Sequence, residues 1–171
     1  MIRFVVVVAA VAMGISACGS TSDVVRPVVG QIPAAVDAIE AELGSDLEYF
    51  EISADLGGVT LILAESASDD SGGVVGMFAT TYRWESGELT SSGETMAAEG
   101  ATFGSSSIDL NPEKLFEQID AELSVPVIVD VAIQGTGTGS TVIDATVVND
   151  KGGTLLVLLS ADGRILGVQA S

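Results

Sequence analysis

A five-residue pattern occurs twice in this chain of 171 residues, and it constrains the fold more than any other feature. The segment Ile39-Glu40-Ala41-Glu42-Leu43 returns eighty residues later as Ile119-Asp120-Ala121-Glu122-Leu123. Apolar residues spaced three and four positions apart share one face of a helix, so each copy predicts an amphipathic helix packed on a core. The residues that we expect these helices to bury are Val36, Ile39 and Leu43 in the first copy, and Leu115, Phe116, Ile119 and Leu123 in the second.

Signals for helix ends lie on both sides of these segments. Pro33 and Pro112 suit the first turn of a helix, where the missing backbone N–H is not needed, and Asn111 suits the N-cap. Gly44 suits the end of the first helix, because glycine readily adopts the left-handed conformation found there.

Two sets of strand patterns follow the two helices. In each set apolar and polar residues alternate, as on half-buried strands, and glycine-containing turns separate the runs. The expected strands are 50–56, 59–64, 74–84 and 88–90 after the first helix, and 127–133, 141–148, 154–160 and 164–168 after the second. The sequence therefore predicts an α+β fold in which two repeated units, each a helix plus a four-stranded antiparallel sheet, pack as one body.

These patterns divide the chain into five parts. Residues 32–93 and 110–171 form the two units, and residues 94–109, rich in Ser, Gly, Glu and Ala, link them. Residues 1–17 have the pattern of a signal peptide, and residues 18–31 that of a lipidated cysteine followed by a tether.

The signal peptide has the form found in bacterial lipoproteins. Arg3 precedes a run of fourteen mostly apolar residues, 4–17, and Cys18 follows the small residues Ser16 and Ala17. A helix that spans a bilayer needs about 20 apolar residues, so this run is too short for a transmembrane anchor. We expect the thiol of Cys18 to carry a fatty acid such as palmitate and to hold the mature chain on the extracytoplasmic face of the cell membrane. A freely secreted protein is the alternative.

The tether has two possible states. Its residues are small, polar or valine, as in an extended linker. A valine pair, either Val24-Val25 or Val28-Val29, would also be able to dock on the folded body. The sequence favours neither state.

The charge of the chain limits its partners. It contains 24 acidic and 6 basic residues, and loss of the leader with Arg3 leaves the mature part at a formal charge of minus 19. Nucleic acid is an unsuitable partner, because its phosphates require clustered lysine and arginine. Anionic lipid headgroups repel such a domain, whereas cationic partners are favoured. Solubility alone also accounts for an acidic surface.

Several kinds of chemistry are excluded by composition. The chain has no histidine, so it lacks the Ser-His-Asp triad and the usual ligands of catalytic zinc. The single cysteine, Cys18, leaves no partner for an internal disulfide. The acidic turn at residues 69–73 lacks the spacing of a calcium loop, and a plain hairpin turn is the simpler interpretation. We therefore expect no enzyme activity, no metal and no cofactor.

Four residues are candidates for a binding site. Leu156 and Leu158 belong to a run of leucines and valine that is apolar on both faces of a strand, so something should cover the second face. Either the other unit shields this strand at the centre of the sheet, or the strand forms the floor of a groove. Tyr82 and Trp84 precede a turn and suit an anchor at a protein interface, but core packing explains them equally well.

The order of helix and strands, with the turn Asp162-Gly163-Arg164-Ile165, resembles the PepSY-like domains of exported bacterial proteins and the tandem units of the beta-lactamase inhibitor protein. Segment 82–89, Phe103 and the helix opening at Pro112 are similar to those of uncharacterised actinobacterial lipoproteins. The resemblance implies a non-catalytic module that binds, and in some cases inhibits, an envelope protein or peptide. It transfers no functional residue. The alternative is a carrier whose sheet lines a cavity for lipid or another apolar ligand.

Overall fold

The computed structural model describes residues 24–68, 74–124, 126–148 and 152–170. Within these ranges two α-helices, two short 3-10 helices and nine strands form one body, which confirms the predicted α+β class. The helical elements are η1 (Val29–Gln31), α1 (Ile32–Leu43), η2 (Ser105–Ser107) and α2 (Pro112–Glu122). The strands are β1 (Glu48–Asp55), β2 (Val59–Ser68), β3 (Val74–Glu85), β4 (Glu88–Ala98), β5 (Phe103–Gly104), β6 (Val127–Gly135), β7 (Thr141–Val148), β8 (Thr154–Leu159) and β9 (Ile165–Ala170).

The helix ends follow the predicted signals. Proline occupies the first turn of both α-helices, and the side-chain oxygen of Asn111 accepts a hydrogen bond of 3.0 Å from the backbone N–H of Lys114. Gly44 ends α1 with a φ of 105°, and its N–H donates to the carbonyl of Glu40. These contacts satisfy backbone groups that a helix end otherwise leaves unpaired.

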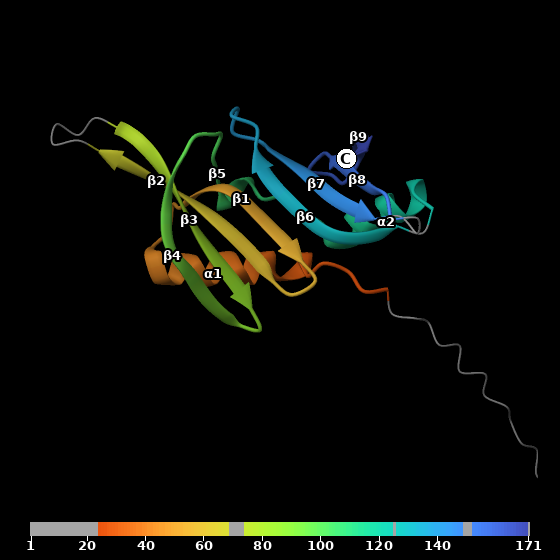
Figure 1. Ribbon diagram of the computed structural model, residues 1–171, viewed down its shortest axis with the longest axis horizontal. Coiled ribbons are helices and arrows are strands. Elements are labelled where there is room, and N and C mark those ends of the chain that lie inside the picture. The colour runs from red at the N-terminus through yellow and green to blue at the C-terminus, as the bar shows by residue number, and fades with distance from the viewer. Residues whose placement is uncertain (1–23, 69–73, 125, 149–151, 171) are drawn as a thin grey trace, which may run out of the picture.

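All strand pairs are antiparallel, and the sheet runs in the order β4-β3-β2-β1-β6-β7-β8-β9 (Figure 1). Each group of four consecutive strands is a meander, and the pairing of β1 with β6 joins the two meanders in the middle of the sheet. The short strand β5 pairs with the first residues of β1, Glu48 and Tyr49. Among the described residues, β4 and β9 form the two edges.

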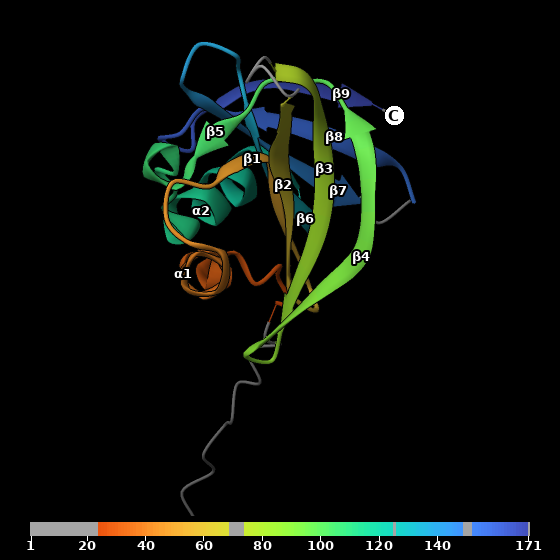
Figure 2. The same ribbon diagram turned by 90° about the vertical axis from the view of Figure 1, so that its left-hand side faces the viewer.

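Both α-helices lie on the same face of the sheet, and the core lies between them and the strands (Figure 2). Every second residue of the central strands points into this core, for example Ile52 on β1 and Val131 on β6, and both are fully buried. The predicted burial is confirmed at Val36, Ile39, Leu115, Phe116 and Ile119. It is wrong at Leu123, which follows the end of α2 and is only partly buried, and at Leu43, which keeps 43% of its surface exposed. Leu43 is the last residue of α1, and the chain leaves the helix at Gly44 before another element can cover it.

Strands β1 and β6 carry the same irregularity. The register of β1 shifts between Tyr49 and Glu51, and that of β6 shifts between Ile128 and Asp130. Each shift places one extra residue in the strand, which bends it and increases its twist. Where the two strands pair with each other, beyond the shifts, Ser53 lies opposite Ala132 at the centre of the ladder.

Strand β4 is longer than the sequence predicts. The run Ser91-Ser92-Gly93 looks like the end of a strand, but β4 continues to Ala98 and takes the first residues of the predicted linker into the sheet. A register shift opposite β3, between Thr80 and Tyr82, accommodates this run. Beyond it the pairing resumes, and the hydroxyl groups of Thr80 and Thr95 form a hydrogen bond of 3.1 Å.

The last residues of the predicted tether dock on the body. The N–H of Val28 donates to the carbonyl of Asp55 at 2.9 Å, and Val29 is buried in the core. Val24 and Val25 remain exposed. The predicted signal peptide and Cys18 lie outside the described residues. Among the residues that the structure describes, no helix has the length and apolar character needed to cross a bilayer.

Candidate binding site

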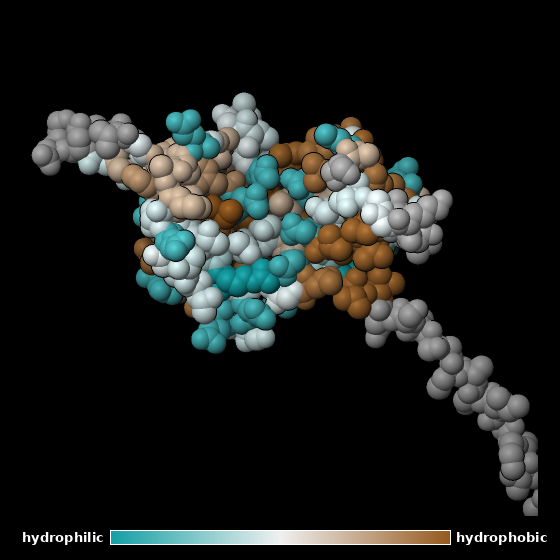
Figure 3. Space-filling view, in the orientation of Figure 1, coloured by the Kyte–Doolittle hydropathy of each residue, from teal (hydrophilic) through white to brown (hydrophobic). Residues whose placement is uncertain are grey.

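The face of the sheet opposite the helices carries a mixed set of charged and apolar side chains, and we call it the open face. This face is turned toward the viewer in Figure 3, with hydrophilic residues in its middle and hydrophobic patches beside them. Residues that alternate with the core positions must point to this side of the sheet. The open face therefore includes Glu51 and Asp55 on β1, Arg83 on β3, Asp130 on β6, Asp144 on β7, and Leu156 and Leu158 on β8.

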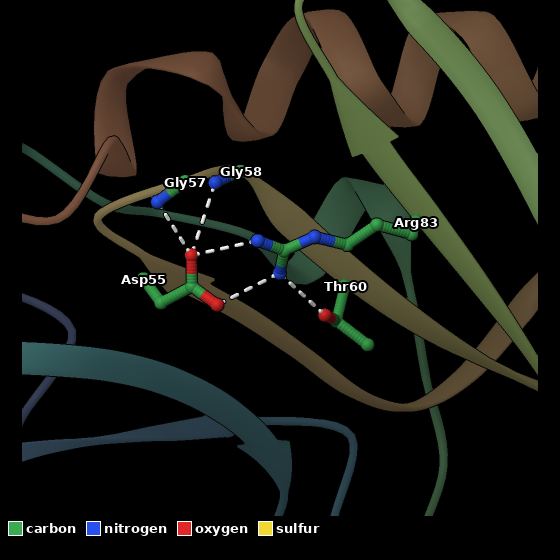
Figure 4. Close-up of polar contacts among 5 residues, drawn as sticks. All are labelled: Asp55, Gly57, Gly58, Thr60 and Arg83. Atoms are coloured by element: carbon green, nitrogen blue, oxygen red, sulfur yellow. Dashed lines mark hydrogen bonds and ion pairs between the residues drawn. The ribbon is translucent and has the colours of Figure 1, made fainter.

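Arg83 and Asp55 form an ion pair on one side of the open face (Figure 4). The guanidinium group donates to both carboxylate oxygens, at 2.7 and 2.9 Å, and also to the hydroxyl of Thr60 at 2.9 Å. The backbone N–H groups of Gly57 and Gly58 donate to the same carboxylate. Together these hydrogen bonds lower the pKa of Asp55 to about 2, and the one from Arg83 has the largest effect.

The tight turn between β1 and β2 positions this pair. Gly58 lies so close to β3 that a Cβ atom there would stand 2.3 Å from the carbonyl oxygen of Trp84. Only glycine allows this approach, which places the N–H groups of the turn against Asp55.

Two further carboxylates, Asp130 and Asp144, lie near the centre of the open face, and the charge of Arg83 acts on the first of them. Burial, the largest cause, and the nearby carboxylates of Glu51, Asp55 and Asp144 together raise the pKa of Asp130 to about 6. Burial also raises the pKa of Asp144, with a contribution from Glu51. Neither Asp130 nor Asp144 forms an ion pair with another described residue.

The described residues of the open face offer hydrogen-bonding and charged groups. Glu51 accepts a hydrogen bond of 3.0 Å from the side-chain amide of Gln134, which fixes its carboxylate beside this centre. No group of three or more acidic residues in the described ranges is arranged to hold a metal ion.

Apolar side chains adjoin these acids on β8. Asp144 lies directly opposite Leu158 in the β7–β8 ladder, and Leu156 follows on the same side of the strand. Leu156 and Leu158 keep 37% and 39% of their surface exposed, and with Gly167, Val168 and Gln169 they line a shallow depression of about 270 Å³. Strand β8 is next to the edge of the sheet, so the expectation that a central position shields it is wrong. The second face of this strand is uncovered by the described residues.

Tyr82 and Trp84 do not join these leucines. They point to the helix side of β3, where both are partly buried and pack against the core. Trp84 lies between Val59 and Leu89 on the neighbouring strands. Of the four predicted binding residues, the structure thus brings only Leu156 and Leu158 together on an exposed surface.

The acidic centre of the open face was not predicted, although the sequence carries a signal for it. Asp130 interrupts the valine-rich run 127–133, and Asp144 interrupts the apolar run 141–148. Burial of a carboxylate in the middle of an apolar strand lowers the stability of the fold unless the charge finds a partner. A carboxylate at such a position therefore indicates a candidate functional site.

Comparison of the chain with protein-family models, with curated proteins and with solved structures finds no match.

Proposed function

We propose that this protein is a lipid-anchored, extracytoplasmic binding module, and that its open face binds a segment of an envelope protein or peptide that carries both basic and apolar side chains. The observation that carries the proposal is the position of two exposed leucines, Leu156 and Leu158, beside the acidic centre formed by Asp130 and Asp144. A surface of this kind fits a cationic side chain next to an aliphatic one.

The charges favour a basic partner. Arg83, a cation on the open face, is already held by Asp55 and Thr60. A lysine or arginine from a partner would favour the ionised forms of Asp130 and Asp144, which burial and mutual repulsion disfavour in the free protein. Relief of this repulsion would contribute to binding, and salt would weaken it.

The anchor in this proposal is Cys18. The short basic start, the apolar run and the small residues before the cysteine support acylation and attachment to the cell membrane on its extracytoplasmic face. The resemblance to PepSY-like domains and to tandem inhibitory modules supports the same class of function. A bound partner enzyme would then be inhibited wherever the contacted segment borders its active site.

A carrier of apolar ligands is less well supported. The space between the helices and the sheet is filled by side chains such as Tyr49, Ile52 and Leu115, which are fully buried. A depression of about 660 Å³ lies instead on the outer side of α2, around Arg26 and Phe116. A lipid would need an enclosed apolar cavity, and these core residues occupy the place where the sheet would line it.

We infer further that the two halves of the chain are copies of one unit made of a helix and a meander. The buried residues of β1, which are Tyr49, Ile52 and Ala54, recur 79 positions later on β6 as Ile128, Val131 and Ile133. The register shift follows the first of them in both strands. Because β1 and β6 pair antiparallel around Ser53 and Ala132, a local twofold axis at this pair would relate the copies.

Site-specific crosslinking on intact cells tests the binding proposal. A photoreactive amino acid at position 158 should capture an envelope polypeptide, whereas the same group at Ala41, an exposed residue of α1 on the other side of the sheet, should capture none. The captured polypeptide, once purified, should bind the wild type more tightly than Leu158→Ser or Asp144→Asn. Equal capture at both positions, or equal affinity for all three proteins, would contradict the proposal.

A fatty-acid label tests the anchor separately. Wild-type protein should incorporate a clickable palmitate analogue, and Cys18→Ser should not. An unlabelled wild type would remove the anchor from the proposal and leave the open face to be judged by the crosslinking result.

A further inference from the structure

One end of the molecule exposes a group of aliphatic side chains, and we call it the apolar end. It consists of Val24, Val25, Leu56 and Val127, which keep between 48% and 68% of their surface exposed. Figure 3 shows a hydrophobic patch where the described part of the chain begins, beside the start of the grey trace. We propose that the apolar end rests on the surface of the lipid bilayer, so that the domain stands on the membrane in one orientation.

The topology brings these residues to the same end. Leu56 directly follows β1, which ends at Asp55. Asp55 pairs with Asp130 near the beginning of β6, so Val127, the first residue of β6, lies at this end too. The hydrogen bond from Val28 to the carbonyl of Asp55 brings the N-terminal segment to the same place.

A clamp on α2 fixes where the N-terminal segment leaves the body. The guanidinium group of Arg26 forms an ion pair with Asp120 and lies 4.8 Å from the centre of the Phe116 ring. Pro27 and Val29, on either side of Val28, are buried. The chain before Val25 must therefore depart from the apolar end and not from another side of the domain.

The short distance along the chain from Cys18 to Val24 indicates that the lipid surface is what covers the apolar end. This step rests on the proposed acylation of Cys18. Six residue steps separate Cys18 from Val24, and at about 3.5 Å each they reach on the order of 21 Å when fully extended. So short a tether holds the apolar end beside the bilayer at an effective concentration near the millimolar range. Four half-exposed side chains that bind weakly in solution would then be bound for much of the time.

The charges at this end favour neutral headgroups. Val59 pairs with Trp84, so the turn after β3 lies at the apolar end and brings the exposed carboxylates of Glu85 and Glu88 with it. Anionic lipids would repel these groups, whereas phosphatidylcholine would not. In the resulting orientation the strands rise from the membrane, and the open face is turned sideways, where a neighbouring envelope protein can reach it.

Hydrogen exchange on a tethered domain tests this orientation. The mature chain, residues 18–171, is coupled through its only thiol, Cys18, to maleimide lipid in phosphatidylcholine vesicles, and is compared with the same protein coupled to a small soluble maleimide. Backbone exchange in peptides covering residues 54–60 and 124–130 should slow at least threefold on vesicles. Exchange in residues 63–68 of β2 and 76–80 of β3, at the opposite end of these strands, should not change.

Variants distinguish contact between the apolar end and the lipid from the effect of attachment to a vesicle alone. The double variant Leu56→Ser and Val127→Ser should lose the protection, whereas Met96→Ser, an equally exposed position away from the apolar end, should keep it. No difference between vesicle and soluble conjugates, or protection that survives the double variant, would overturn the proposal. Because the coupling is chemical, this outcome is independent of whether Cys18 is acylated in cells, which the palmitate label decides.

Discussion

Arg83 reaches across β2 and holds both carboxylate oxygens of Asp55, so the end of β1 is fastened to β3 by side chains as well as by the ladder between them. Two-point arginine–carboxylate contacts are stronger than single hydrogen bonds, but this pair is partly exposed and solvent screens it. We expect Asp55→Asn to lower the free energy of unfolding by about 1 kcal/mol at pH 7.

The stability lost in Asp55→Asn should decrease as the pH falls. The pKa of Asp55 is about 2 in the folded protein, below its ordinary value of 3.8. The pair therefore stabilises the fold fully above pH 4, and this contribution disappears as the pH falls toward 2. In urea unfolding, the difference between wild type and Asp55→Asn should be smaller at pH 2.5 than at pH 7, because part of the ionised Asp55 has been lost at the lower pH. Arg164→Gln, which removes the exposed Arg164–Asp162 pair, serves as the control and should change little.

Asp130→Asn should have the opposite effect on stability. Because the pKa of Asp130 is raised to about 6, the folded protein binds this proton more tightly than the unfolded chain does. Ionisation of Asp130 thus costs stability above pH 6, and the asparagine variant should gain about 1 kcal/mol at pH 7.5 after allowance for partial exposure. The gain should vanish below pH 4. If the variant and the wild type are equally stable at pH 7.5, ionisation of Asp130 does not destabilise the fold and the prediction is wrong.

The same variant should bind its partner less well. A gain in stability together with a loss of binding is typical of residues kept for function. Asp37→Asn, which alters an exposed carboxylate on the outer side of α1, should affect neither property. Thermal unfolding and affinity for the crosslinked polypeptide provide the two measurements.

Truncation of Ile39 and of Ile119 should destabilise the protein to a similar degree. Ile39 lies on α1 and Ile119 on α2, and both side chains are fully buried. Replacement of a buried isoleucine by alanine lowers the free energy of unfolding by about 2 to 5 kcal/mol. Because the sheet is continuous, each variant should unfold in a single transition with the two halves together. Two separate transitions, with each variant shifting only its own, would show that the halves are independent domains.

Gly58→Ala should disturb the turn that supports Asp55. The new Cβ would meet the backbone carbonyl of Trp84, which cannot move without shifting β3, and we expect a loss of about 2 kcal/mol. Gly167→Ala offers a matched control in a strand, because nothing lies within 4 Å of its Cβ position. Both values can be read from urea denaturation, and equal stability of the two variants would contradict the close approach at Gly58.

The helices and most of the strands could be predicted from the sequence because their signals are local. Asn111 and Gly44 fix helix ends through contacts with their own neighbours, and the alternation around Ile52 marks a half-buried strand without reference to the rest of the chain. The extension of β4 past Gly93 could not be predicted in this way, since it depends on pairing with β3 across a register shift.

The candidate site was only partly predictable for the same reason. Exposure of Leu156 and Leu158 depends on the position of β8 next to an edge strand, which is a property of the whole sheet. Trp84 points to the core because of its register with Val59, and no local pattern records that register. Asp130 and Asp144 were visible as interruptions of apolar runs, but their proximity follows from the pairing of β6 with β7.

The eight-strand path across the sheet leaves its two borders, β4 and β9, seven strand spacings apart. Along the sheet, at about 4.8 Å per spacing, this is on the order of 34 Å. Each border has its own row of backbone N–H and C=O groups, so a strand added at one border would not use the hydrogen-bonding groups of the other.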